Sequence, residues 1–426
     1  MNIKKINAND IIDGFVIMTG LSFMLSLLVE FISQPLQIGR FFIMFAILFV
    51  FHLYRFPKGF FNVLGFIRQN NIIIYFLLIY LIDSIINYLF FERWGKCLYN
   101  FAILFIFLSY LYNCYLYNEK KIKKIINYYL YYCIWNGLSI VILVLLVPLG
   151  LSWERNDITD IYELFSGHSE WTMRSYFPYY LSVASNYHPS IGFPVFSGLS
   201  HEPHVIMYIL SPAFFILMGI IERRLYKYLL CVAFLIIILD TTSTTAIISF
   251  LLCLVIEFGY LFVVKKNIFI SILGLIIICM GGFIFVEYAL PIIELMENKI
   301  GSSSQDTSTN MLGYLLSFDL IGEGNVPEAK GFELTAKAGI VGILDIILFI
   351  WMLYKILFLI ISRERYYHYV GIAALYFLLH NLKVSYLSFS YPYLAFILFI
   401  IIIETKSQKS VSHEKISDFT HQVVTC

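Results

Sequence analysis

Residues 200–204 read Ser-His-Glu-Pro-His and lie directly before a long apolar run. Proline is favoured as the first residue of a helix, and Ser200 or Glu202 could cap it. The start of that helix would present unpaired N–H groups and a partial positive charge, which suit a phosphate. His201, Glu202 or His204 would then supply a base for an attacking hydroxyl. An ordinary capped helix at a water interface would use the same residues.

Two lysines and a hydroxyl-rich turn could bind charged or sugar groups elsewhere in the chain. Lys330 and Lys337 are seven residues apart, so they share one face if both are helical, and together they could hold a pyrophosphate. Lys337 could equally pair with Glu333, four residues earlier. The turn at residues 240–245 includes Ser243, and its hydroxyls could bind glycan or phosphate or could simply cap a helix.

A resident metal or cofactor is not expected. The stretch His-Glu-Pro-His differs from the zinc signature H-E-x-x-H, and no third ligand is evident. The seven cysteines contain no C-x-x-C pair, and none lies in either of the long polar segments described below. We therefore interpret the cysteines as small apolar residues within helices.

The composition is that of an integral membrane protein. Hydrophobic residues make up 60% of the 426 residues and charged residues only 13%, with a mean hydropathy of +0.81. Soluble domains are about half apolar and a quarter charged. The dispersed basic residues and the net charge of +1 give no indication of nucleic-acid binding. The sequence predicts an all-α polytopic fold with about 12 transmembrane helices.

The apolar runs give the candidate spans, and the first is interpreted as a retained span because no cleavage site follows it. The spans are 11–32, 39–54, 72–91, 97–117, 126–150, 203–221, 227–240, 243–263, 267–289, 332–361, 367–385 and 390–404. With both termini in the cytoplasm, 19 of the 29 Lys and Arg residues fall inside and 7 outside. A polar patch at His380, Asn381 and Lys383 should face the interior of the bundle.

Residues 1–404 are predicted to form one transmembrane domain, followed by a polar cytoplasmic tail at 405–426. Two long extracytoplasmic loops interrupt it, at about 151–202 and 288–331. The first loop is rich in acidic and aromatic side chains, a mixture that suits sugar binding, although an aromatic belt at the membrane surface would use the same rings. No internal repeat is visible, which disfavours transporter folds built from paired halves.

Three local pieces resemble the bacterial O-antigen and capsular repeat-unit polymerases (the Wzy-type family), which are related to the O-antigen ligases. Residues 198–203, Gly-Leu-Ser-His-Glu-Pro, are similar to the family's Gly-Leu/Phe-x-x-Glu-Pro before a span. Residues 241–245 are similar to its Ser/Thr-rich turn. Residues 322–342 are similar to its closing Gly-rich segment and span, and the three pieces occur in the family's order.

The chain departs from the family pattern at its cations. Family members often carry an arginine shortly before the Gly-Leu/Phe element, and here Arg174 is the nearest substitute. An arginine often follows the serine of the middle motif, where this chain has Thr244. Ligases often show His-Asn ahead of the last Gly-rich helix, whereas this chain has Lys330-Gly331, which favours a polymerase.

The resemblance implies a glycosyltransferase in the bacterial cytoplasmic (inner) membrane that polymerises repeat units carried on undecaprenyl pyrophosphate. It implies lipid-linked glycan donor and acceptor as partners, within membrane lipid, and leaves room for a chain-length regulator. His201 or Glu202 would be the base with His204 in support, and Arg174, Lys330 and Lys337 would bind the diphosphate. A ligase with another acceptor and a flippase or other transporter of lipid-linked oligosaccharides are the alternatives.

Overall fold

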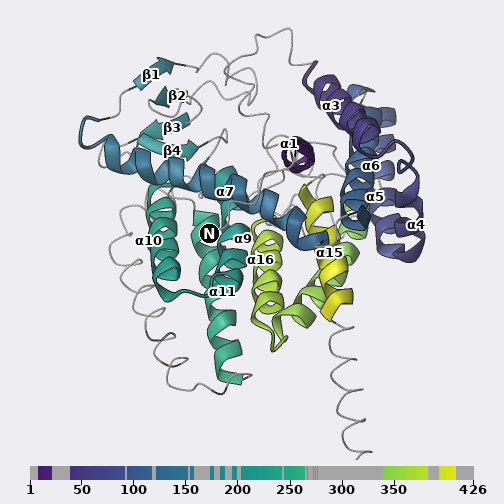
Figure 1. Ribbon diagram of the computed structural model, residues 1–426. Coiled ribbons are helices and arrows are strands. Elements are labelled where there is room, and N and C mark those ends of the chain that lie inside the picture. Colours follow the sequence, from purple (N-terminus) through teal and green to yellow (C-terminus); the bar gives the residue numbers. More distant parts are fainter. Residues whose placement is uncertain are drawn as a thin grey trace, which may run out of the picture.

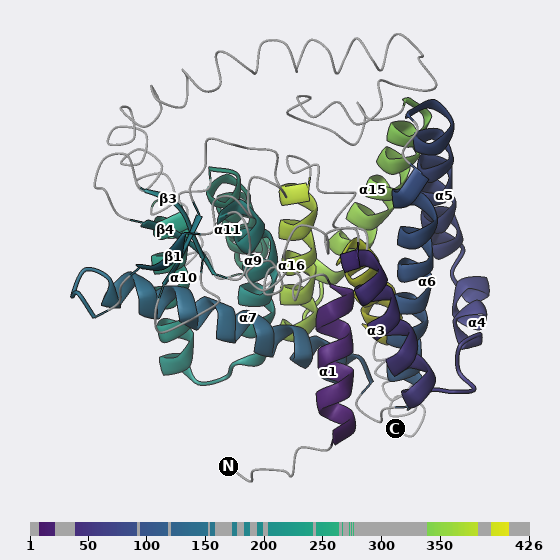
Figure 2. The same ribbon diagram turned by 90° about the horizontal axis from the view of Figure 1, so that it is seen from above.

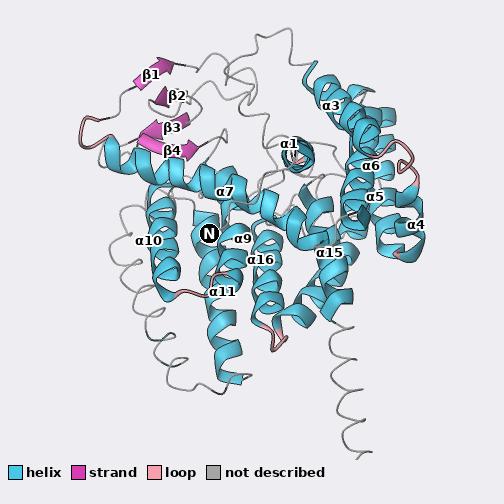
Figure 3. Ribbon diagram, in the orientation of Figure 1, coloured by secondary structure: helices cyan, strands magenta, loops and turns pink. Residues whose placement is uncertain are grey.

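The computed structural model describes most of the predicted helices and part of the first long loop. The described residues are 8–21, 39–91, 94–117, 121–151, 154–157, 173–176, 183–187, 194–198, 203–241, 244–263, 266, 272, 274, 276, 339–381 and 393–408. Within these ranges the chain is mainly helical, as the sequence predicts (Figure 3).

The described helices mostly follow the long apolar runs, because such runs can satisfy their backbone polar groups internally. They are α1 (Ala8–Gly20), α3 (Gly39–Arg55), α4 (Asn62–Gln69), α5 (Asn71–Phe91), α6 (Trp94–Tyr117), α7 (Lys121–Leu146), α9 (Pro203–Ile220), α10 (Arg224–Thr241), α11 (Thr244–Val263), α15 (Gly339–Ile360), α16 (Arg365–Asn381) and a helix over 393–408. Most described ends lie within a few residues of the predicted ones. The last helix continues to residue 408, so the predicted tail begins as helix.

Two groups of helices meet along α7 and α1 and through the packing of α15 on α5. In the first, α16 packs on α9, α11 and α15, and α9 also packs on α10 and α11. In the second, α6 packs on α3, α4 and α5. Helix α7 crosses over α9, α10 and α16 instead of running alongside them, and α1 lies between α7 and the second group (Figures 1 and 2). This crossing differs from a bundle in which every predicted span is parallel.

The first long loop contains a small β-sheet that the all-α prediction did not include. Its strands, β1 (Glu154–Asp157), β2 (Met173–Tyr176), β3 (Val183–Tyr187) and β4 (Pro194–Gly198), are antiparallel and lie side by side in chain order. Runs of four or five residues are too short to show a clear alternation, so they carry little strand signal. Pro194 is tolerated because it begins an edge strand. Strand β4 rests against α7, α9 and α10 (Figure 1).

Helix length and apolar character identify few complete spans within the described part of the chain. Ile122–Leu146 is long and apolar enough to cross a membrane alone. Asn62–Gln69 and Asn71–Ile82 would add a second span if this pair, bent by 104°, counts as one. Shorter apolar helices are Met44–Arg55, Ala102–Tyr117, Ile206–Ile220, Ala246–Phe262 and Ile347–Ile360.

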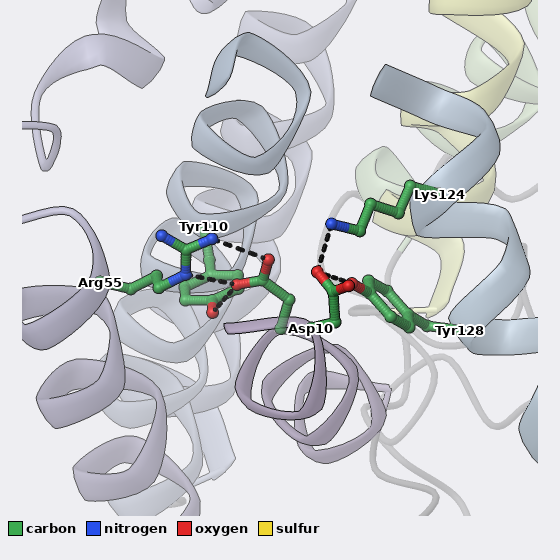
Figure 4. Close-up of polar contacts among 6 residues, drawn as sticks. Asp10, Arg55, Tyr110, Lys124 and Tyr128 are labelled. Atoms are coloured by element: carbon green, nitrogen blue, oxygen red, sulfur yellow. Dashed lines mark hydrogen bonds and ion pairs between the residues drawn. The ribbon is translucent and has the colours of Figure 1, made fainter. Parts of the chain in front are cut away.

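Two carboxylates on α1 join it to its neighbours (Figure 4). Asp13 is fully buried; its Oδ1 accepts from Arg55 Nε at 3.1 Å and from the Tyr110 hydroxyl at 2.8 Å. Its Oδ2 accepts from Arg55 Nη2 at 3.3 Å. Asp10, one turn earlier, pairs with Lys124 of α7, and both side chains are about a third exposed. The two pairs differ in burial. A buried charge that loses its partner costs far more free energy of folding than an exposed charge does.

Replacing the two aspartates separately should separate these contributions. Asp13→Asn should lower the free energy of unfolding by about 3 kcal/mol, because the Arg55 guanidinium then faces a buried amide instead of a carboxylate. Asp10→Asn, the same change one turn away, should cost less than about 1 kcal/mol. Thermal unfolding of the purified protein in detergent would measure the loss of stability in each variant. Equal losses would contradict the larger structural contribution assigned to the Asp13–Arg55 pair.

Candidate functional site

The predicted helix start at Pro203 is confirmed, since α9 begins at this residue. Strand β4 ends at Gly198, so the motif at residues 198–203 connects the end of a strand to the start of a helix. His201 and Glu202 lie outside the described residues, and His204 is in the first turn of α9, where the backbone alone is described. The described elements on either side, β4 and α9, therefore bound the motif.

Gly198 is required by both backbone conformation and space. Its φ is +59°, in the left-handed region that side chains disfavour. A Cβ atom there would lie 2.1 Å from Oδ1 of Asn136 and 3.2 Å from Cδ1 of Ile140, both on α7. The close approach of β4 to α7 thus depends on a glycine at the first position of the motif.

The hydroxyl-rich turn lies beside the same strand. The backbone N–H of Phe196 donates a hydrogen bond of 2.9 Å to Oδ2 of Asp240, in the last turn of α10. The Phe196 ring is fully buried and meets Tyr176 of β2 edge to face, with ring centroids 5.3 Å apart. A contact between residues 44 positions apart therefore joins the strand that leads into the first motif segment, 198–203, to the helix that ends at the second, 241–245.

Arg174 belongs to the sheet that carries this contact. In β2 it pairs with Ala184 of β3, which in turn pairs with Phe196 of β4, so the three residues form one row across the sheet. Two strand spacings put the Arg174 backbone about 10 Å from that of Phe196. The register thus places the predicted cation on the same small sheet as the motif strand.

The other predicted site residues are not placed. Ser243, Lys330 and Lys337 lie outside the described residues, as does Lys383. Helix α15 begins two residues after Lys337 and packs on α16, which packs on α9. The expectation that His380 faces the interior is confirmed, because its side chain is fully buried; its ring lies 5.3 Å from that of Tyr208 and its Nδ1 is 3.2 Å from the Tyr376 hydroxyl.

Two further residues shape this region: Asp240, which the sequence indicated only as the first member of the polar cluster at 240–245, and Asn136, which was not singled out. Asp240 opens the hydroxyl-rich turn and Asn136 interrupts an apolar run of α7, and both are buried. A polar side chain within an apolar run is a general signal for a structural or functional contact, so Asn136 could have been found in this way. Its partner strand could not, because the pairing joins distant parts of the chain.

Comparison with known protein families, with curated proteins and with solved structures found no match for this chain.

The role of Gly198 can be tested against a second glycine of the same conformation. Gly198→Ala should destabilise the protein by several kcal/mol, since the new methyl group overlaps Asn136 in addition to the backbone strain. Gly150 has a φ of +66° with nothing within 4 Å of its Cβ position, so Gly150→Ala should show the strain alone, about 1 kcal/mol. Thermal unfolding in detergent measures the difference; equal shifts would mean that β4 does not pack closely on α7.

Proposed function

We propose that this chain is a polytopic membrane glycosyltransferase that polymerises polysaccharide repeat units. It joins oligosaccharides carried on undecaprenyl pyrophosphate into O-antigen or capsular polysaccharide, at the outer face of the bacterial cytoplasmic membrane. The observation that carries the proposal is the Phe196–Asp240 contact, which joins the strand leading into the Gly-Leu-Ser-His-Glu-Pro segment to the helix that ends at the hydroxyl-rich turn. The elements that lead into two segments resembling the polymerase family in sequence are thus in contact.

Exposed apolar faces support a membrane location. On α10 most of the large exposed side chains recur every three or four residues, so they form one stripe along the helix. They are Leu225, Tyr228, Leu229, Val232, Leu235 and Leu239. Similar exposed residues occur on α5, α11 and α15. Soluble monomers rarely show apolar patches of this extent, whereas lipid tails would cover them without cost.

Several polar contacts agree with the predicted alternation of spans. Arg365 Nη2 at the start of α16 donates to the Ile221 carbonyl just after α9, at 2.9 Å, and both positions are predicted to be cytoplasmic. The Tyr366 hydroxyl donates to Glu404 Oε1 at 2.7 Å, again between two predicted cytoplasmic ends. The Asp13–Arg55 pair joins another two such ends. The Phe196–Asp240 contact joins two positions on the opposite, outer side.

The proposed reaction transfers a growing glycan from one lipid carrier to another repeat unit. An acceptor hydroxyl attacks the anomeric carbon of the donor and gives its proton to His201 or Glu202, with His204 in support. The bond from that carbon to the phosphate oxygen breaks, and undecaprenyl pyrophosphate leaves with the electron pair. Arg174, Lys330 and Lys337 stabilise the departing diphosphate, and Ser243 offers a hydroxyl to the glycan or phosphate. The chemistry as written needs no metal ion.

Glu202 gives the sharpest test of the site. If Glu202 is the base, Glu202→Ala should lower the rate of chain extension at least a hundredfold, while the amount of protein in the membrane stays the same. Glu222→Ala makes the same change at an exposed position beyond the other end of α9 and should leave extension unaltered. The measurement is the surface-glycan ladder of a deletion strain carrying each variant. A full-length ladder with Glu202→Ala would remove Glu202 from the site.

The sidedness of the second loop can be tested by cysteine labelling. In a chain whose native cysteines are replaced, Ser303→Cys should react with a membrane-impermeant maleimide added to intact spheroplasts, because residues 288–331 are assigned to the outer face. Ser417→Cys in the tail should react only after the membrane is opened. Labelling of both before lysis, or of Ser417→Cys alone, would contradict the topology and with it a reaction at the outer face.

A further inference from the structure

Asp240 is a buried carboxylate with one engaged oxygen. Only 6% of the residue is exposed. Oδ2 accepts the hydrogen bond from the Phe196 backbone N–H, and Oδ1 is buried with no hydrogen-bond partner among the described residues. Among the described residues, no basic side chain forms an ion pair with this carboxylate. The ion pairs found among them involve Asp10, Asp13 and Glu257.

This position is unfavourable for a carboxylate. Asp240 lies in the last turn of α10, where the helix presents its partial negative charge, and a carboxylate there is repelled. Burying the group with no partner for Oδ1 among the described residues adds a desolvation cost. In return, Asp240 accepts the hydrogen bond of the Phe196 backbone N–H.

The group that Asp240 holds is the strand leading into the motif. Phe196 precedes Gly198 by two residues and Glu202 by six. The four residues 199–202 are therefore bounded by Gly198, which packs on Asn136, and by Pro203, which begins α9. If β4 separated from α10, the strand end of this segment would lose one of its attachments and keep its packing on α7 and its pairing with β3. A catalytic group displaced by about 1 Å can lose a hundredfold in rate.

We propose that Asp240 is a positioning residue that fixes the outer loop onto α10 and thereby sets the position of Glu202. It acts through the Phe196 backbone and, being buried, does not itself touch the glycan. The proposal rests on the proposed function only in naming Glu202 as the residue positioned; the attachment of β4 to α10 is independent of it.

Hydrogen exchange measured by mass spectrometry on the purified full-length protein tests the attachment. Asp240→Ala should raise exchange at residues 194–198 about ten- to a hundredfold, the loss expected for one hydrogen bond to a charged acceptor. Asp240→Asn keeps an acceptor and should give a smaller rise in the same peptide, which also serves if the alanine variant does not accumulate. Thr241→Ala should leave this peptide unchanged, because the Thr241 hydroxyl is adjacent and buried but bonds within its own helix, to Ile238 at 3.3 Å.

The surface-glycan ladder then tests positioning. Asp240→Ala should shorten the ladder and Asp240→Asn should restore it in part, in the order of their effects on exchange. Unchanged exchange at 194–198 in both variants would overturn the proposal whatever the ladder shows. Raised exchange with a full-length ladder would overturn the positioning of Glu202. Raised exchange in the variants, together with a normal ladder in a strain lacking the gene, would contradict the proposed polymerase function and still support the attachment of β4 to α10.

Discussion

Apolar helices pack without a preferred partner, so the few polar contacts between them decide which ends lie together. In this protein those contacts gather near helix ends. Asp13 joins α1 to α3 and α6 through Arg55 and Tyr110, and Arg365 joins α16 to the end of α9. Each is a buried or half-buried group whose loss of partner would be costly, so the alternatives to the observed pairing are disfavoured. The Phe196–Asp240 hydrogen bond does the same for the first long loop.

For the candidate site, the consequence is that strand β4 of the first long loop is held against the helices. Strand β4 is fixed at three points: the Asp240 carboxylate, the close approach of Gly198 to Asn136, and the contact of the Phe196 and Tyr176 rings. A chemical group is positioned more accurately on a segment held at both ends than on a free loop. The proposed base lies on such a segment, between the end of β4 and the start of α9.

The sequence predicted the features that depend on residues close together in the chain. Long apolar runs indicated most helices to within a few residues, and Pro203 marked the start of α9. The buried position of His380 followed from a polar residue inside an apolar run. The sheet, the bent pair α4 and α5, the crossing of α7, and the pairing of Asp240 with Phe196 were not predicted. Each depends on contacts between distant positions, and a single sequence carries little signal for those.

The surface polysaccharide of a strain that lacks this gene tests the central claim most directly. Gel analysis should show the normal ladder collapsed to material bearing a single repeat unit, with that unit still delivered to the outer surface. An unchanged ladder would contradict a polymerase. Loss of all surface glycan with lipid-linked units retained would contradict it in another way, because a ligase or a flippase would then be the missing activity.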